Sequence, residues 1–197
     1  ALVEFASVIR TPGSAPVLQQ RDRMPGARWF ADTRLNFAEN LLARRDDQVA
    51  LVFRNERGTR RALTYGELYA EVARVAAGLR ELGIRPGDRV AGFLPNLPEA
   101  VIAMLATTSL GAVWTSCSPD FGINGVLDRF GQIEPRVLFT ADGYFYGGKT
   151  LDSLGPIRGV LARLPSVEKV VVVPYVDSNP DLSGLPAAAA FGDFGKP

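Results

Sequence analysis

The sequence predicts an α/β fold in which a parallel sheet with a mixed edge is flanked by helices. Three observations predict it. Four short apolar runs have the length of buried strands, segments of helical length separate them, and turn residues mark most of the junctions. Connections of this length suit crossovers between parallel strands. The expected strands are Arg89–Leu94, Ala112–Cys117, Arg136–Thr140 and Lys169–Val173.

Residues 1–45 are expected to form an N-terminal arm that leads into a short helix. Prolines and glycines interrupt the first 28 residues, and neither a period of 2 nor one of 3.6 is visible there. Apolar residues then recur at helical spacing from Leu35 to Leu42, which predicts a short amphipathic helix ending near Arg45.

A β-hairpin is expected next, with strands over Gln48–Arg54 and Thr59–Thr64. The residues between them, Asn55-Glu56-Arg57-Gly58, are typical of a tight turn. This hairpin adds an antiparallel element ahead of the parallel strands. Its arginines are expected to form a solvated basic edge that discourages further strand pairing: Arg57, Arg60 and Arg61.

Local signals predict where the first two long helices begin. Thr64 and Glu67 have the spacing of a capping box, in which each side chain satisfies the other residue's backbone N–H. Gly83 suits the end of that helix, since glycine readily adopts a left-handed backbone. Asn96 is expected to cap the next helix, with Pro98 in its first turn.

Two further helices are expected over Gly125–Ile133 and Thr150–Leu164. Glycine, alanine and proline dominate Gly184–Pro197, which shows no regular period. The chain is therefore expected to have three parts: the arm and short helix over residues 1–45, an α/β subdomain over residues 46–176, and a linker or disordered tail over residues 177–197.

Composition excludes several classes of function. The chain has 22 basic and 21 acidic residues, a balance that predicts no non-specific hold on nucleic acid or anionic membranes. With no histidine and one cysteine, it cannot build a serine–histidine or cysteine–histidine nucleophile, and no metal site is expected. The apolar runs are too short to span a membrane. A single cysteine, Cys117, suits a reduced cytoplasmic compartment, and it is expected to be a small buried hydrophobe.

Three loops are expected at the carboxyl ends of the strands, where ligands bind in such sheets. They are Pro95–Leu97, Ser116–Ile123 and Asp142–Lys149. Their small residues would let a ligand approach the backbone, and the same residues are also those that ordinary α/β turns require. Within these loops Asp120 and Asp142 could orient a ligand hydroxyl or cap a turn.

The third loop matches the phosphate-binding pattern G-x-x-x-x-G-K-[ST] over Gly143–Thr150. Between a strand and a helix, such a loop offers glycine amides, a lysine charge and a hydroxyl to a phosphate. Three consecutive aromatics, Tyr144–Tyr146, would crowd it, and an aspartate closing another apolar strand is missing. A P-loop NTPase and a general phosphate- or nucleotide-contacting loop are therefore both open at this point.

Six segments of the sequence together form a recognisable pattern: Trp29–Leu42, Leu63–Leu68, Arg85–Val90, Pro95–Glu99, Leu110–Gly122 and Ala141–Lys149. They resemble segments of the acetyl-CoA-synthetase-like, adenylate-forming enzymes. The last two have the form typical of the acetoacetate–CoA ligase (acetoacetyl-CoA synthetase) branch, and the resemblance extends over about residues 5–175.

This resemblance implies a two-step ligation. A carboxylate attacks the α-phosphorus of ATP to form an acyl-adenylate and pyrophosphate, and the CoA thiol then displaces AMP to form a thioester. For this branch the acid would be acetoacetate and the product acetoacetyl-CoA, used in lipid and ketone-body metabolism, with magnesium accompanying ATP. The fold implied is part of the large N-terminal domain of such an enzyme.

The resemblance also implies a CoA-binding region but no catalytic residue in this chain. Lys149 keeps the positive charge expected opposite a CoA phosphate, together with a helix N-terminus, whereas Tyr146 departs from the expected basic residue. The glycine-rich turn at Asp120–Gly122 resembles one that lines the CoA nucleotide. The CoA-binding residues implied are Tyr146, Gly147, Gly148, Lys149, Asp120, Phe121 and Gly122.

Other parts of the family pattern are missing from the sequence. The Ser/Thr/Gly-rich loop that contacts the ATP phosphates, the later adenine and ribose motifs and the adenylation lysine do not occur. We therefore expect the chain to be the N-terminal part of a longer polypeptide, inactive alone, whose partners are the remaining polypeptide and small-molecule substrates. A stand-alone module that binds CoA or a nucleotide is the alternative, followed by the P-loop NTPase.

Overall fold

The expected apolar strands pair with one another in a five-stranded parallel sheet. The computed structural model describes residues 2–196, and the sheet has the strand order β11-β10-β7-β5-β6. Every neighbouring pair in it is parallel. Its strands are β5 (Arg89–Phe93), β6 (Val113–Cys117), β7 (Val137–Ala141), β10 (Lys169–Val173) and β11 (Ala189–Ala190).

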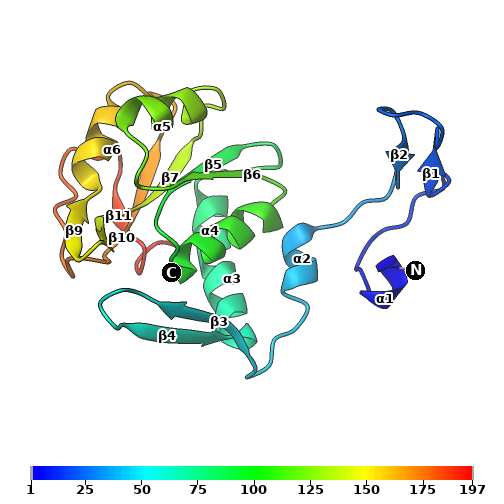
Figure 1. The fold of residues 1–197 in the computed structure, drawn as a ribbon, viewed down its shortest axis with the longest axis horizontal. Helices are drawn as coiled ribbons and strands as arrows, with labels where there is room; N and C mark the ends of the chain where they lie inside the picture. The colour runs from blue at the N-terminus through cyan, green and yellow to red at the C-terminus, as the bar shows by residue number, and fades with distance from the viewer. Residues whose placement is uncertain (1, 197) are drawn as a thin grey trace.

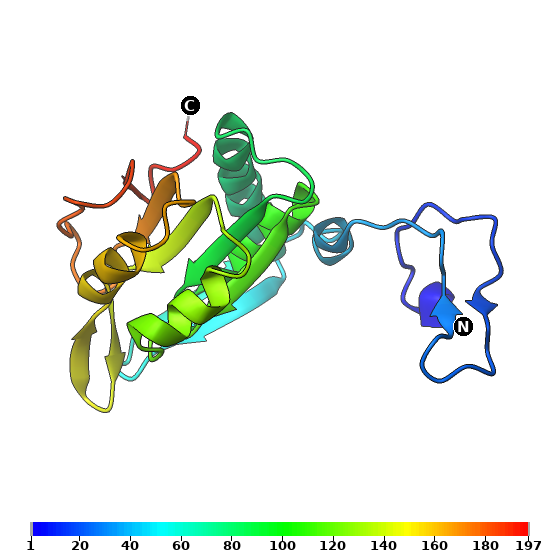
Figure 2. The same cartoon turned by 90° about the horizontal axis from the view of Figure 1, so that it is seen from above.

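Helices cover both faces of this sheet (Figures 1 and 2). One face packs against α3 (Tyr65–Glu81) and α4 (Pro98–Ser109), and the other packs against α5 (Ile123–Phe130) and α6 (Leu154–Leu161). Alternate residues of the three inner strands, β5, β7 and β10, enter the two apolar cores, as the two-residue period of a strand requires. Burial on both faces explains why these inner strands are rich in apolar residues. The α/β prediction is confirmed.

The helix starts follow the local signals only in part. Thr64 caps α3 as expected: its hydroxyl accepts from Glu67 N at 3.1 Å, and the Glu67 carboxylate accepts from Thr64 N at 2.8 Å. The prediction that Asn96 caps α4 is wrong. The N-cap is Leu97, whose side chain gives no cap, and Pro98 supplies the first turn. Proline at this position has no N–H to satisfy and already has a helical φ, which lessens the need for a cap.

The expected hairpin forms a sheet of its own. Strands β3 (Val49–Arg54) and β4 (Arg60–Thr64) pair antiparallel and do not join the five-stranded sheet. In Figure 1 this hairpin lies along the lower side of the body, with its turn reaching toward β9. The antiparallel element is therefore present, but it is separate from the parallel one.

The helix expected over Thr150–Leu164 is shorter, because a second hairpin takes its first turn. Strands β8 (Gly143–Tyr146) and β9 (Lys149–Asp152) pair antiparallel, and α6 begins only at Leu154. The chain reverses at Gly147 and Gly148, whose φ angles are +58° and +75°. Two successive residues with positive φ make the tight turn that joins twisted strands, and glycine adopts them without strain.

Residues 177–197 were expected to be a linker or a disordered tail, but the structure shows residues 189–194 packed against the body. Strand β11 pairs parallel with β10, and the backbone N–H of Phe191 donates to Val172 O at 2.7 Å. Phe191 and Phe194 are buried, and their rings pack edge-on against Phe139. Next to Phe194, a Cβ on Gly195 would clash with the Arg74 carbonyl, so a glycine lets the chain approach α3 closely there.

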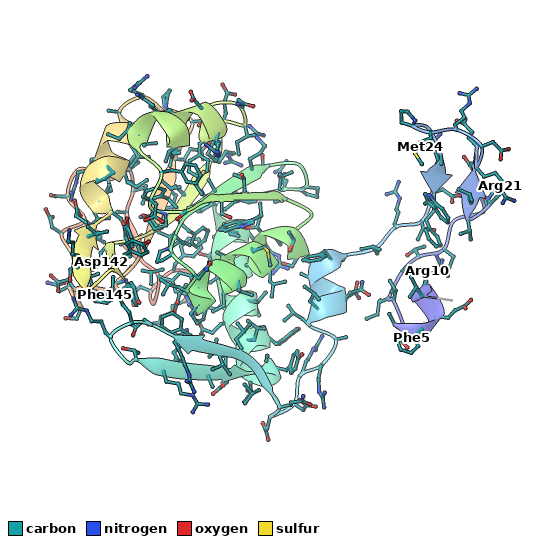
Figure 3. The ribbon with its side chains drawn as sticks, in the orientation of Figure 1. Phe5, Arg10, Arg21, Met24, Asp142 and Phe145 are labelled. Carbon is teal, nitrogen blue, oxygen red and sulfur yellow. The ribbon has the colours of Figure 1, made fainter. Side chains whose placement is uncertain are left out.

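The N-terminal arm extends away from the body (Figures 1 and 2). It contains α1 (Leu2–Phe5) and the short paired strands β1 (Leu18–Gln19) and β2 (Arg28–Trp29), and it leads into α2 (Phe37–Leu41). Figure 3 shows Phe5 and Met24 on this arm, and both side chains are exposed. Among the described residues, no helix has the length and hydropathy of a membrane span.

Candidate functional site

The carboxyl ends of β7 and β10 meet at the buried carboxylate of Asp142. Its Oδ1 accepts from the backbone N–H of Tyr175 at 2.8 Å and of Val176 at 3.0 Å, and its Oδ2 accepts from Asp177 N at 2.6 Å. Asp142 is 7% exposed. The backbone therefore occupies the carboxylate, and of the two roles open to Asp142 the structure supports the cap.

Asp120 joins the loop after β6 to the β8–β9 hairpin, the two segments that the resemblance assigns to CoA binding. Its Oδ1 accepts from the Tyr144 hydroxyl at 2.8 Å, and its Oδ2 accepts from the Ser118 hydroxyl at 2.8 Å. Burial, followed by the hydrogen bond to Asp120, raises the pKa of Tyr144 to about 12. The loop after β6 is thus tied to β8, so Asp120–Gly122 lies next to the first strand of the β8–β9 hairpin.

The rest of this loop is open. The Phe121 ring is 39% exposed and lies under the Arg129 guanidinium, 4.2 Å from its centroid. Gly122 precedes α5 with a φ of −64°, and a Cβ built on it would meet no atom within 4 Å. Neither the backbone nor the packing within the described residues requires a glycine at this position.

The β8–β9 hairpin presents Tyr146 and Lys149 side by side. The two residues are paired across the Gly147–Gly148 turn, and both are exposed. Residues directly opposite in an antiparallel pair project from the same face with adjacent Cβ atoms. Tyr146 and Lys149 therefore share one face at the tip of the hairpin.

The P-loop interpretation of Gly143–Thr150 is wrong. Lys149 and Thr150 are the first residues of a strand, and no helix begins there. A P-loop needs its lysine and hydroxyl at a helix N-terminus, where the amides converge on the phosphates. The expectation that a helix N-terminus assists Lys149 falls with it.

The turn of the first hairpin contacts the turn of the second. The Glu56 carboxylate accepts from Gly148 N at 3.0 Å, and Arg57 Nη2 donates to Gly148 O at 3.2 Å. The Arg57 guanidinium also lies 5.0 Å from the centroid of the Phe145 ring. We call these four residues, Glu56, Arg57, Phe145 and Gly148, the hairpin junction; Phe145 lies at the side of the body nearest the β3–β4 turn (Figure 3).

Aromatic packing at Tyr175 supports this junction. Its ring packs edge-on against Phe145 with a centroid separation of 5.2 Å and against Phe53 at 6.1 Å. Its hydroxyl accepts from Asn55 Nδ2 at 2.9 Å. The segment after β10 thus connects both hairpins, and no local pattern in the sequence predicts this contact.

The arginines of the first hairpin do more than form a solvated edge. Arg57 belongs to the junction, and Arg61 Nη1 forms a 2.7 Å ion pair with Glu99 Oε1. The side chain of Glu99 is only 10% exposed, so Arg61 compensates a nearly buried charge. Only Arg60 fits the expectation of an exposed residue without a further role in the described contacts.

Cys117 fits its expected role. It is 5% exposed, and burial raises the pKa of its thiol, which opposes formation of a reactive thiolate. Within residues 2–196 no group of three or more cysteine, aspartate or glutamate side chains is arranged to hold a metal ion.

A family model described as AMP-binding enzyme matches residues 37–194. The chain belongs to this family. The match begins at α2 and ends at Phe194, so it includes the C-terminal residues that were expected to be a linker. Membership of the AMP-binding enzyme family and the position of Lys149 in a strand together leave the P-loop NTPase interpretation without support.

Several curated proteins are similar in sequence to this chain. A curated acetoacetyl-CoA synthetase from Macaca fascicularis is 48% identical over 170 residues, which are 84% of this chain and 25% of that protein. One from Rhizobium meliloti (strain 1021) is 47% identical over 183 residues, 93% of this chain and 28% of that protein. A malonamoyl-CoA synthetase from Penicillium aethiopicum is 43% identical over 173 residues, 84% of this chain and 24% of that protein.

A solved family structure has the same fold. The acetoacetyl-CoA synthetase from Streptomyces lividans matches with a TM-score of 0.90 and 43% identity, over 100% of this chain and 30% of that one. The resemblance found in the sequence is therefore confirmed. The chain spans about a quarter of the length of the curated relatives that it matches.

Proposed function

We propose that this chain is part of an ATP-dependent acid–CoA ligase that converts acetoacetate and CoA to acetoacetyl-CoA. The observation that carries the proposal is membership of the AMP-binding enzyme family together with 46–48% identity to acetoacetyl-CoA synthetases. In the reaction, a carboxylate oxygen bonds to the α-phosphorus of ATP and pyrophosphate leaves. The CoA sulfur then bonds to the acyl carbon, and AMP leaves.

The choice of acid can be narrowed by chemistry. One relative is a malonamoyl-CoA synthetase, and malonamate differs from acetoacetate only by an amino group in place of the terminal methyl. Both are short acids with a carbonyl group β to the carboxylate. We propose acetoacetate as the substrate and malonamate as its nearest competitor, because the acetoacetyl-CoA synthetases are the more similar relatives.

The proposed CoA subsite consists of Tyr146, Gly147, Gly148 and Lys149 on the β8–β9 hairpin, with Asp120, Phe121 and Gly122 beside it. Three observations support it. The Lys149 ammonium is exposed beside Tyr146, the Asp120–Tyr144 hydrogen bond holds the loop against the hairpin, and Gly122 has open space around it. Lysine binds phosphate as a point charge, and a flat aromatic ring beside it suits a nucleotide.

Catalysis is proposed to reside outside this chain. The ATP-phosphate loop is missing from the sequence, and the described carboxylates do not group in a way that would hold the magnesium that accompanies ATP. The fragment by itself is therefore expected to be inactive and to depend on the remaining polypeptide. We propose a cytoplasmic location, where a buried free thiol such as Cys117 stays reduced.

The proposal is tested by thioester formation in the full-length protein with ATP, magnesium, CoA and a panel of acids. We expect acetoacetate to be preferred over malonamate, acetate and propionate. Absence of thioester with every acid, from folded full-length protein, would refute the ligase and favour a module that only binds CoA or a nucleotide.

The CoA subsite has its own test. Lys149→Met is expected to raise KM for CoA about tenfold, because an exposed charged hydrogen bond contributes about 1.4 kcal/mol. With dephospho-CoA, which lacks the 3′-phosphate, the same substitution should change KM little. Lys196→Met is the matched control, since Lys196 is exposed and pairs with Asp193 at 3.1 Å, away from the hairpin. Equal effects on CoA and dephospho-CoA would contradict a contact between Lys149 and that phosphate.

A further inference from the structure

Both polar groups of the Gly148 backbone are already engaged by the first hairpin. Its N–H donates to Glu56 Oε1 at 3.0 Å, and its carbonyl accepts from Arg57 Nη2 at 3.2 Å. Arg57 Nη2 also lies 3.4 Å from Thr150 Oγ1. Two adjacent side chains of one turn therefore fix the backbone of another turn from 92 residues away along the chain.

These contacts fall on one side of the β8–β9 hairpin. Phe145 and Thr150 are paired across it, and the next pair toward the tip is Tyr146 and Lys149. Successive residues of a strand project to opposite faces, so Phe145 and Thr150 share one face while Tyr146 and Lys149 share the other. Arg57 packs on the first face and leaves the second one free.

The Gly147–Gly148 turn needs such support. Glycine adopts positive and negative φ with similar ease, so two consecutive glycines leave the tip of an isolated hairpin conformationally free. The observed values of +58° and +75° are one conformation among many that this turn could adopt. The direction in which Lys149 projects depends on that conformation, because Lys149 follows the turn directly.

We propose that Glu56 and Arg57 are positioning residues for the CoA subsite: they hold the Gly147–Gly148 turn from behind, so that Tyr146 and Lys149 face the CoA phosphate. This inference rests on the proposed function. It has a second consequence, because the Gly148 N–H is committed to Glu56 and is not available to an anion. Recognition of the phosphate at this tip then depends on the Lys149 side chain and not on a main-chain nest.

The alternative is that the junction only stabilises the fold. Glu56 and Arg57 are both exposed, and exposed polar contacts of this kind contribute little to global stability. Their loss should therefore leave the melting temperature of the protein nearly unchanged. A positioning role predicts a change in CoA binding without a change in stability, which a purely structural role does not.

The test uses the full-length enzyme with Arg57→Gln and, separately, Glu56→Ala. Each is expected to raise KM for CoA about three- to tenfold, with KM for ATP and for the acid unchanged and with little change for dephospho-CoA. In a Lys149→Met background, Arg57→Gln should add little further, because residues that act through one another are not additive. Arg57→Lys, which can still donate to the Gly148 carbonyl, should restore part of the affinity. Arg60→Gln, on the same hairpin, is the matched control.

The outcomes separate this inference from the proposed function. Thioester formation by the unmodified enzyme tests the ligase alone. An unchanged KM for CoA in both junction variants would overturn the inference and leave the ligase and Lys149 standing. An equal rise for CoA, dephospho-CoA and ATP would also overturn it, because that pattern indicates general disruption. If Lys149→Met itself has no effect, the inference falls together with the subsite.

Discussion

The burial of Phe194 makes a quantitative prediction about the C-terminal residues. Its side chain is 6% exposed, and its ring packs edge-on against Phe139 at a centroid distance of 5.9 Å. It fits so closely against α3 that a Cβ on Gly78 would lie 2.9 Å from it. Burying roughly 150 Å² of apolar surface contributes about 4 kcal/mol, and partial burial in the unfolded chain reduces this to about 3 kcal/mol. Phe194→Ala should remove about that much from the local stability of the tail.

Hydrogen exchange in the full-length protein measures this loss. The Phe191 N–H, bonded to Val172 O at 2.7 Å, reports whether β11 is docked. A loss of about 3 kcal/mol corresponds to a fall of roughly 100-fold in its protection from exchange. Asp193→Ala is the control, because the Asp193 side chain is 76% exposed. If the Phe191 N–H exchanges freely in the unmodified protein, β11 is not docked and the tail is a linker. If Phe194→Ala leaves the protection of this N–H intact, burial of Phe194 does not hold β11 in place, and the reasoning is refuted.

Two further predictions concern the loops at the carboxyl edge of the sheet. Asp142→Ala should destabilise the protein by about 3 kcal/mol, because it leaves the N–H groups of Tyr175, Val176 and Asp177 without their acceptor, and thermal unfolding measures this. A change of under about 0.5 kcal/mol, as at an ordinary surface site, would contradict that role. Tyr144 should ionise near pH 12 in an ultraviolet titration, and Asp120→Asn should bring its pKa partway back toward 10. Because the folded-state pKa is the higher one, the stabilisation from neutral Tyr144 should be complete below pH 10 and be lost between pH 10 and pH 12. Titration of Tyr144 at its ordinary pKa would disprove the buried hydrogen bond.

The parts of the fold that follow from local signals could be predicted from the sequence. Strands that are covered on both faces are apolar throughout, and such runs stand out between helices of amphipathic period. The capping box at Thr64 and Glu67 is a contact between near neighbours, so its spacing alone predicts it. The order of the strands in the sheet is not such a signal, because it depends on how the crossovers pack.

Two of the errors in the fold have a common origin, because in each a composition pattern hid the residues that decide the structure. Gly147 and Gly148 fit a phosphate-binding pattern, although two consecutive glycines between short strands also form a hairpin turn. In residues 177–197 the many small residues masked Phe191 and Phe194. At the first place the backbone conformation of two glycines decides the structure, and at the second the burial of two aromatic side chains does.

The sequence predicts only part of the proposed site, for a different reason. The loop at Asp120–Gly122 and the hairpin at Tyr146–Lys149 were identified separately by resemblance, but the Tyr144–Asp120 hydrogen bond that joins them depends on the tertiary fold.

The hairpin junction could not be predicted from the sequence at all. Glu56 and Arg57 are charged residues in a turn, and such residues usually face solvent. The turns lie within hydrogen-bonding distance of each other where the Tyr175 ring packs against Phe145 of one hairpin and Phe53 of the other. A contact of this kind is decided by where the β3–β4 hairpin docks, and that placement depends on the whole fold. The inference about Glu56 and Arg57 therefore follows from the structure and could not have come from the sequence pattern.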